Sequence, residues 1–155
     1  MAKKPRVLFL CTHNSARSQM AEAFLREYGG DFFEAYSAGL EPEPIHPLTV
    51  RVMKEVGFDL LDLGHRPKAL DEFLMKKHVG YLITVCANAE EKCPTYPFVS
   101  VREYWGFDDP AAFEGTEVEQ LAKFREIRDE IEDKVRAFIA RETTVDSARL
   151  DRRPR

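Results

Sequence analysis

Near the amino terminus, a cysteine and an arginine are separated by five residues, a spacing that suits the capture of a tetrahedral oxyanion. The segment is Cys11-Thr12-His13-Asn14-Ser15-Ala16-Arg17-Ser18, which has the form C-x5-R-S. Between a buried strand and a helix, such a loop can turn its backbone N–H groups inward, and Arg17 adds a planar fork that holds an oxyanion bidentately. The same positive field favours a thiolate at Cys11, and a thiolate facing a bound oxyanion is a nucleophile. We therefore expect residues 12–18 to bind the substrate and Cys11 to attack its central atom.

Two further cysteines, Cys86 and Cys93, form a C-x6-C pair in the segment CANAEEKCP. The pair follows a run that we expect to be a buried strand, so it lies at the same sheet edge as Cys11. Three cysteines are an odd number, which is poor evidence for structural disulfides and better evidence for reactive thiols. Two thiols that pass to a disulfide supply two electrons. The polar, proline-bounded surroundings predict that neither Cys86 nor Cys93 is buried.

A pair of adjacent carboxylates, Asp108 and Asp109, lies in the predicted turn GFDDP. A carboxylic acid beside the bound anion could protonate the oxygen that departs. Both residues also suit a purely structural role, because Asp commonly initiates turns. The turn alone leaves open which of the two, if either, acts as the acid.

The loop and the cysteine pair need a scaffold that brings them together. Val7 to Leu10 is a short apolar run typical of a strand buried on both faces, and Thr116 with Glu119 matches the capping box that starts a helix. From such signals we expect strands at 7–10, 32–36, 81–85 and 98–101, and helices at 17–28, 47–56, 70–77 and 116–141. The last helix carries an apolar stripe that we expect to be core, formed by Leu121, Phe124, Ile127, Ile131, Val135 and Phe138.

This alternation predicts an α/β fold, namely a three-layer, doubly wound domain with a four-stranded parallel sheet in flavodoxin-like order. In such folds ligands bind at the carboxyl ends of the strands, where the loop from Cys11 to Arg17 begins. A length of 155 residues fits one domain. We expect residues 1–141 to form a single catalytic domain and 142–155 to be a frayed polar tail, because the apolar periodicity ends near Arg141.

The composition argues against several classes of protein. The 27 acidic and 23 basic residues give a net charge of −4, whereas nucleic-acid binders usually carry an excess of Lys and Arg. No apolar run approaches the roughly 18 residues of a membrane helix, and Val7 to Leu10 is too short for a signal-peptide core, so we expect a cytoplasmic protein. The four histidines show no ligand spacing, which predicts no metal ion. We also expect no cofactor and a monomeric chain.

Several stretches of the sequence are similar to one family. Residues 11–26, CTHNSARSQMAEAFLR, resemble the phosphate-binding loop and first helix of low-molecular-weight protein tyrosine phosphatases, and more closely those of the arsenate reductases built on the same fold. The residues that follow Arg17, SQMAE, are reductase-like, since the phosphatases usually carry proline after the Arg-Ser pair. The resemblance covers roughly residues 6–140 and extends to the stretches YSAG, MKEVG and YWGFDDP.

The resemblance to the arsenate reductases implies a relay of three thiols with arsenate as the substrate. Cys11 attacks arsenate, Cys86 then attacks Cys11 while arsenite leaves, and Cys93 finally attacks Cys86. The resulting Cys86–Cys93 disulfide is reduced by thioredoxin. A helix of seven residues spans about 10 Å, whereas a disulfide needs Cα atoms within roughly 7 Å. We therefore expect segment 86–93 to be a helix or loop in the reduced state, with Cys86 nearer Cys11, and to unwind on oxidation.

Two other functions remain open. A low-molecular-weight protein tyrosine phosphatase needs Cys11, Arg17 and Asp109, the residue directly before the proline where the family carries its general acid, but neither Cys86 nor Cys93. A non-catalytic oxyanion-binding module would tolerate the loss of Cys11. Among the reductases, mycothiol-coupled and glutathione-coupled relatives also exist, and the paired Cys86 and Cys93 favour thioredoxin.

The resemblance also concerns the groups behind the loop. Asn14 and Ser37 match positions that brace the loop by hydrogen bonds in the family, and asparagine tolerates a left-handed backbone. Some relatives bind potassium beside the loop, through residues that align with Asn14, Glu22, Ser37 and an acidic residue near position 66. This chain has Arg66 there. Because a guanidinium group repels a cation and can replace its charge, we expect the activity not to depend on potassium.

Overall fold

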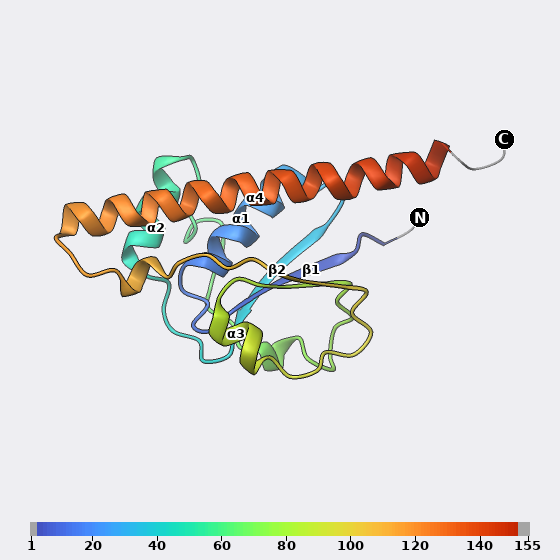
Figure 1. The fold of residues 1–155 in the computed structure, drawn as a ribbon, viewed down its shortest axis with the longest axis horizontal. Helices are drawn as coiled ribbons and strands as arrows, with labels where there is room; N and C mark the ends of the chain where they lie inside the picture. The colour runs from blue at the N-terminus through green and yellow to red at the C-terminus, as the bar shows by residue number, and fades with distance from the viewer. Residues whose placement is uncertain (1–2, 152–155) are drawn as a thin grey trace.

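The chain folds around a four-stranded parallel sheet in which the strands follow the order β2-β1-β3-β4 (Figure 1). The computed structural model describes residues 3–151. Its strands are β1 (Arg6–Cys11), β2 (Glu34–Gly39), β3 (Tyr81–Thr84) and β4 (Val101–Tyr104), and its helices are α1 (Arg17–Gly29), α2 (Pro47–Glu55), α3 (Ala87–Lys92) and α4 (Glu117–Asp151). Single turns of 3₁₀ helix occur at Leu70–Glu72 and Pro110–Ala112. The flavodoxin-like strand order expected from the sequence is confirmed.

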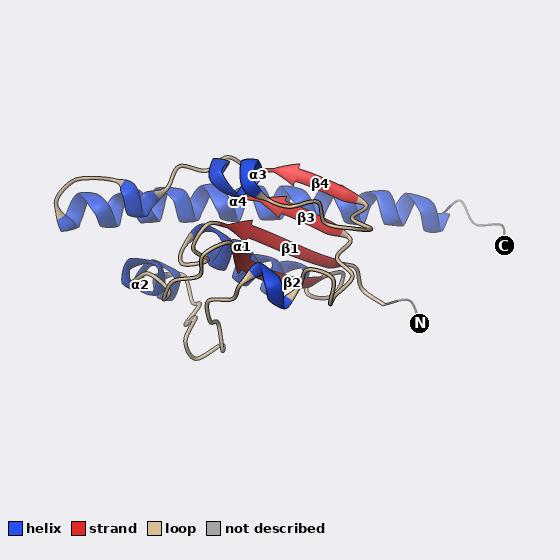
Figure 2. Cartoon of the chain, turned by 90° about the horizontal axis from the view of Figure 1, so that it is seen from below, coloured by secondary structure: helices blue, strands red, loops and turns tan. Residues whose placement is uncertain are grey.

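Strand β1 is the centre of the sheet, because its residues Val7 to Leu10 are fully buried and it pairs with both β2 and β3. Figure 2 shows the four strands running in the same direction, with α1 and α4 behind them. The register places Cys11 opposite Gly39 of β2 and Leu10 opposite Thr84 of β3. The residues that follow β3 therefore emerge beside the residues that follow β1, as a parallel sheet requires.

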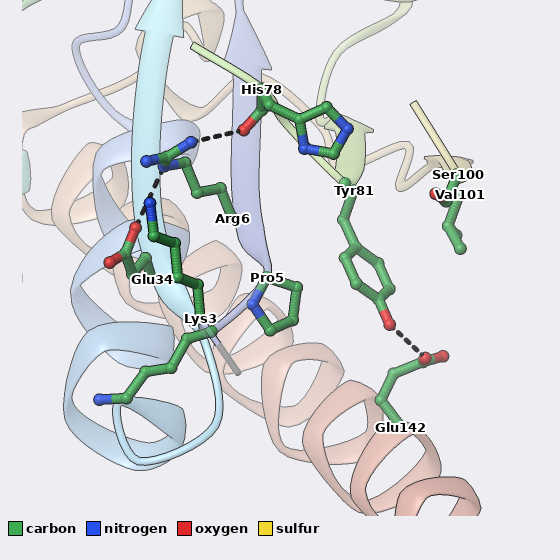
Figure 3. Close-up of a pocket in the computed structure, with 11 residues that line it drawn as sticks. Lys3, Pro5, Arg6, Glu34, His78, Tyr81, Ser100, Val101 and Glu142 are labelled. Atoms are coloured by element: carbon green, nitrogen blue, oxygen red, sulfur yellow. Dashed lines mark hydrogen bonds and ion pairs between the residues drawn. The ribbon is translucent and has the colours of Figure 1, made fainter. Parts of the chain in front are cut away.

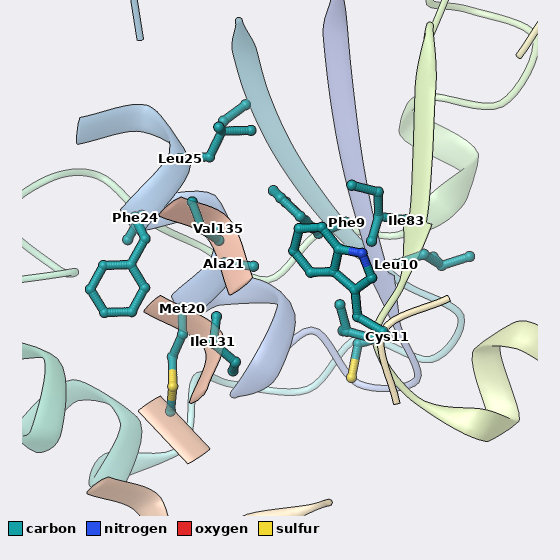
Figure 4. Packing of buried hydrophobic residues seen from close by; sticks show 14 of the residues in the cluster. Phe9, Leu10, Cys11, Met20, Ala21, Phe24, Leu25, Ile83, Ile131 and Val135 are labelled. Atoms are coloured by element: carbon teal, nitrogen blue, oxygen red, sulfur yellow. The ribbon is translucent and has the colours of Figure 1, made fainter. Parts of the chain in front are cut away.

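Helices α1 and α4 cover one side of the sheet, and α3 lies on the other side (Figure 1). All six residues of the predicted apolar stripe of α4 are buried, and Figure 4 shows Ile131 and Val135 of this stripe next to Met20 and Phe24 of α1. The predicted capping box is present, since Glu119 N–H donates to Thr116 Oγ1 and Thr116 N–H donates to Glu119 Oε1. The capping box fixes where α4 begins, and the apolar stripe packs the helix against the core.

Helix α4 is longer than the sequence predicts. The apolar periodicity ends near Arg141, but the helix continues to Asp151. No glycine or proline occurs between Glu117 and the end of the helix, so nothing interrupts its backbone hydrogen bonds. Tyr81 Oη also donates to Glu142, which ties the start of the extension to the sheet.

Two further elements differ from the prediction. The fourth strand is not at 98–101 but at Val101–Tyr104, because Phe98 is 81% exposed and has a left-handed backbone that no strand accommodates. As an edge strand, β4 alternates between half-buried and exposed residues and so lacks an apolar signal. The helix predicted at 70–77 is reduced to the turn Leu70–Glu72, since Met75 also has a positive φ. Within the described residues, no helix is long and apolar enough to span a membrane.

Candidate active site at the carboxyl edge of the sheet

The loop between β1 and α1 begins at Cys11 and closes against the end of β2. At Gly39 a Cβ atom would lie 2.8–2.9 Å from backbone atoms of Thr12, His13 and Asn14. Only glycine allows this approach, so the residue at the end of β2 is part of what shapes the loop. Figure 4 shows the Cys11 sulfur at the end of β1, beyond the packed side chains of the core.

Asn14 is the centre of the hydrogen bonds that hold the loop. Its backbone is left-handed, with a φ of 54°, and its side chain is fully buried. Asn14 Nδ2 donates to Ser18 Oγ (2.8 Å) and Ser37 Oγ (3.0 Å). Asn14 Oδ1 accepts from Gln19 Nε2 (3.0 Å) and from the Lys68 N–H (2.9 Å). Since every hydrogen-bonding position of the amide is used, the conformation of the loop is fixed before any ligand binds.

Arg17 presents an unused donor at the same place. Its Nη1 donates to the Phe107 carbonyl (3.0 Å), and its Nη2 lies 3.6 Å from Asp109 Oδ2. Its Nε is buried and has no hydrogen-bond partner among the residues that the structure describes. A buried guanidinium N–H without a partner is costly, and an oxyanion bound in the loop would satisfy it. This orphaned donor is the structural observation that most directly fits the predicted anion cradle.

The two adjacent aspartates point to different partners. Asp109 accepts from the Ala111 N–H (3.0 Å) and faces Arg17, whereas the Asp108 side chain is 79% exposed and pairs with Lys123. Asp109 thus both caps the turn at Pro110 and reaches the loop. A cavity of about 270 Å³ lies between Asp109 and the loop. The residues that line it include Cys11, His13, Ser15, Arg17, His46 and Asp109.

Cys86 lies directly beside the loop, because it follows β3 and caps α3. Its Sγ accepts from the Ala89 N–H (3.3 Å) and lies 3.3 Å from Thr12 Oγ1. Cys86 is only 4% exposed, so the prediction that it is not buried is wrong. Its neighbours in the sequence are polar, but as the second residue after strand β3 it lies between the loop and the end of the sheet.

Cys11 ends β1 and Cys86 follows the neighbouring strand β3, and each thiol shifts the pKa of the other. Cys11 lowers the pKa of Cys86 to about 5, with further help from Thr12 and the Ala89 N–H. Cys86 and burial in turn raise the pKa of Cys11 above its ordinary value despite the nearby Arg17. The lowering of the Cys11 pKa expected from the positive field of the loop is therefore outweighed in the free protein.

Cys93 occupies the opposite end of α3 and is half-buried. Its Sγ donates to the Pro94 carbonyl (3.3 Å), and burial raises its pKa above the usual value. The six residues of α3 separate it from Cys86, and along a helix the two Cα atoms are about 10 Å apart. The geometry matches the expected reduced form, in which Cys86 is near Cys11 and Cys93 is not.

Behind the loop, the positive charge that the sequence analysis expects from Arg66 is supplied by other side chains. Glu22 is buried, and its carboxylate lies 2.9 Å from His65 Nδ1 and 3.8 Å from Lys68 Nζ. Burial alone would raise the Glu22 pKa, but His65 and Lys68 hold it below its usual value. Arg66 instead pairs with Glu72 (2.8 Å). Because an ammonium group and an imidazole already face Glu22, the residues do not fit a potassium ion.

His13 and His46 make their contacts with neighbouring backbone groups. His13 is half-exposed and contacts the Glu41 carbonyl (3.1 Å), while His46 accepts from the Leu48 N–H (3.0 Å) at the start of α2. Among the described residues, no three His, Cys, Asp or Glu side chains are grouped so that they could hold a metal ion.

A larger cavity, of about 620 Å³, lies at the opposite edge of the sheet (Figure 3). It is lined by residues at the amino ends of the strands, and its charged groups bond to one another: Arg6 to Glu34 (3.2 Å) and to the His78 carbonyl (3.0 Å). Because ligands of such folds bind at the carboxyl ends of the strands, we place the candidate site at the smaller cavity beside Cys11.

The sequence matches the profile of the low molecular weight phosphotyrosine protein phosphatase family over residues 6–150. The chain belongs to this family. It is 42% identical to an arsenate reductase of Bacillus subtilis (strain 168) over 132 residues, which cover 85% of this chain and 93% of that protein.

The solved structures that are similar to the chain include two arsenate reductases. One is described as an arsenate reductase in the phosphate binding state, with a TM-score of 0.74 and 29% identity, covering 88% of this chain and 98% of that one. The other is a thioredoxin-dependent arsenate reductase of Corynebacterium glutamicum, with a TM-score of 0.66 and 32% identity, covering 88% of this chain and 61% of that one. The family and fold expected from the sequence are thereby confirmed.

Proposed function

We propose that this protein reduces arsenate to arsenite through Cys11, Cys86 and Cys93, and that thioredoxin returns it to the reduced state. The observation that carries the proposal is the position of Cys86, whose sulfur lies 3.3 Å from the hydroxyl oxygen of Thr12, the residue next to Cys11 in the loop. A phosphatase of this family needs Cys11, Arg17 and Asp109 alone and has no use for a second thiol beside its loop. The similarity to proteins named arsenate reductase supports the same choice.

In the first step, arsenate binds in the loop and accepts from Arg17 Nε, which no group within residues 3–151 accepts from. Movement of one proton from Cys11 Sγ to Cys86 Sγ leaves Cys11 as the thiolate. This thiolate attacks arsenic, a sulfur–arsenic bond forms, and Asp109 protonates the departing oxygen so that it leaves as water. Asp109 suits this role because it is the aspartate that reaches Arg17.

In the second step, arsenic is reduced. Cys86, again a thiolate once it has lost that proton to solvent, attacks Cys11 Sγ. A sulfur–sulfur bond forms, the sulfur–arsenic bond breaks, and its electron pair stays on arsenic, which passes from the pentavalent to the trivalent state and leaves as arsenite. Because Cys86 Sγ lies 3.3 Å from Thr12 Oγ1, beside Cys11, this attack needs little movement of the chain.

In the third step, the Cys93 thiolate attacks Cys86 Sγ, and Cys11 leaves as a thiolate. Because α3 holds Cys86 and Cys93 about 10 Å apart, it must unwind before they can join. The exposed disulfide is then reduced by a dithiol of thioredoxin, and the similarity to a thioredoxin-dependent reductase supports this partner. The cycle starts from three free thiols, which favours a reducing compartment such as the cytoplasm. All its groups come from one chain within residues 1–141, which we take as the catalytic unit of a monomer.

The proposal is tested by measuring arsenite formation with thioredoxin and its reductase, beside the hydrolysis of an aryl phosphate. We expect arsenite formation that depends on arsenate and stops in Cys93→Ser after a single turnover, with Cys11 and Cys86 joined. Rapid aryl phosphate hydrolysis without arsenite formation would instead identify a phosphatase.

A further inference from the structure

Asn88, on the first turn of α3, bonds to the oxyanion loop. Its Nδ2 lies 2.9 Å from Thr12 Oγ1, and the same hydroxyl oxygen lies 3.3 Å from Cys86 Sγ. Asn88 is half-buried and belongs to none of the residues that the family resemblance assigns. A continuous chain of contacts therefore runs from α3 through the loop to the second sulfur of the relay.

The donors and acceptors of these side chains set the direction of the hydrogen bonds between them. A carboxamide nitrogen only donates, while a hydroxyl group has one proton to give and two lone pairs to receive with. Thr12 Oγ1 therefore accepts from Asn88, and its own proton is free to be donated to Cys86 Sγ when that sulfur is a thiolate, which has no proton to give. Without Asn88, no donor would hold the Thr12 oxygen in this position, and the hydroxyl group would be free to turn away from the sulfur.

The direction matters because it distinguishes the two forms of the sulfur. A thiolate accepts hydrogen bonds strongly, whereas a thiol accepts them weakly. Cys86 Sγ already accepts from the Ala89 N–H at 3.3 Å, so a second donor aimed at it stabilises the negative form further. The same contact would do little for a neutral thiol.

We propose that Asn88 is a positioning residue for the second step, which holds the Thr12 proton towards Cys86 Sγ so that this sulfur attacks Cys11 as a thiolate. The proposal rests on the proposed function, because it concerns the step in which the Cys86–Cys11 bond forms and the Cys11–arsenic bond breaks. It also explains why the stabilisation of the Cys86 thiolate ends after the second step. When α3 unwinds for the third step, Asn88 moves away from Thr12, and Cys86 loses the donors that favoured its charge.

The test is the pH dependence of Cys86 alkylation by iodoacetamide, followed by peptide mass spectrometry so that each cysteine is read separately in the otherwise native chain. Asn88→Asp keeps the shape of the side chain but turns a donor into an acceptor, so Thr12 then donates to position 88. Asn88→Leu removes the donor without adding charge. In both variants we expect the pH midpoint of Cys86 alkylation to rise by about one unit, so that alkylation well below the midpoint falls roughly tenfold.

Two controls separate positioning from general effects. Ala87→Gln changes an exposed neighbouring residue without adding charge and should change Cys86 alkylation by less than about twofold. Thr12→Val should reproduce the loss, and adding Asn88→Leu to it should cause no further change, because Asn88 acts only through the Thr12 hydroxyl. Thr12→Ser, which keeps the hydroxyl, should retain the low midpoint.

The proposal is overturned if Asn88→Asp and Asn88→Leu leave the midpoint of Cys86 unchanged, or if the effects of Thr12→Val and Asn88→Leu simply add. The titration needs no arsenate, so its result is independent of whether the protein reduces arsenate. Conversely, a chain that forms no disulfide with arsenate refutes the proposed function and leaves the titration as it was.

Discussion

The two halves of the site that meet at Cys11 and Cys86 are built in opposite ways. The loop of residues 11–17 closes around Asn14, whose side chain is fully buried and uses all its hydrogen-bonding positions. Helix α3 has six residues, and of these only Ala89 is buried. One half is held by fully buried contacts with several distant segments, and the other by side chains that are only half-buried, such as Asn88 and Glu90.

This difference matches what each half has to do in the proposed cycle. Stabilising a charged oxyanion requires donors that are already in place, since moving them during the reaction costs free energy. Joining Cys86 to Cys93 requires a segment that unwinds, and a short exposed helix opens at low cost. Rigidity in this site is thus confined to the half that binds the oxyanion.

Cys11→Ser removes the thiol at the rigid half and should produce the largest effect. A serine hydroxyl is not ionised at neutral pH, so arsenite formation should fall to background. Thermal unfolding followed by circular dichroism serves as the control, because the variant should keep a melting temperature close to that of the native chain. Full activity would exclude every enzymatic account of the loop.

Arg17→Lys tests the geometry of the rigid half. A point charge cannot replace a planar fork whose Nε is free for the anion, so kcat/KM for arsenate should fall about 100-fold or more. Arg51→Lys is the matched control, since Arg51 is an exposed arginine that pairs with Glu117. If the two variants behave alike, the loop does not depend on a fixed guanidinium group.

The pH dependence of the two thiols at the ends of α3 sharpens the comparison within the mobile half. The Cys86 pKa is about 5 and that of Cys93 is raised, so at pH 6 the first is still a thiolate and the second is not. Between about pH 8 and pH 6, Cys93 alkylation should fall roughly 100-fold and Cys86 alkylation less than about twofold. Parallel profiles for both thiols would show that Cys86 is not set apart by its contacts with the loop.

Asn14→Ala compares the stability that each half contributes. Removing this side chain leaves several buried groups without partners and places alanine in a left-handed backbone, so we expect a loss of about 2–4 kcal/mol in the free energy of unfolding. Glu91→Ala, on the exposed side of α3, should change it by less than about 0.5 kcal/mol. Urea denaturation measures both, and equal losses would contradict the contrast.

The sequence predicts the rigid half well because its signal is local. The Cys11-x5-Arg17 spacing lies within one loop between a buried strand and a helix, and Asn14 was expected to accept a left-handed backbone there. The apolar stripe of α4 is likewise read from its own periodicity. In each case the residues that determine the structure are neighbours in the chain.

The remaining features depend on residues that are far apart in the sequence. Asn88 meets Thr12 across 76 positions, and Lys68 meets Glu22 across 46, so no local pattern reveals either contact. The expected positive charge beside Glu22 is present, but it belongs to Lys68 and His65 rather than Arg66. Independence from potassium stays a prediction with a different physical basis. The sequence predicts an exposed Cys86, because it shows the polar neighbours of this residue but not the loop that covers the thiol.

The central claim is that oxidation ends at Cys86 and Cys93, and it is tested most directly by mapping the cysteines. The native protein is treated with arsenate in the absence of any reductant, and its disulfides are identified by mass spectrometry. The account predicts a dominant Cys86–Cys93 disulfide with Cys11 free. Accumulation of a Cys11–Cys86 disulfide in the native chain, or three thiols that remain free, would contradict it.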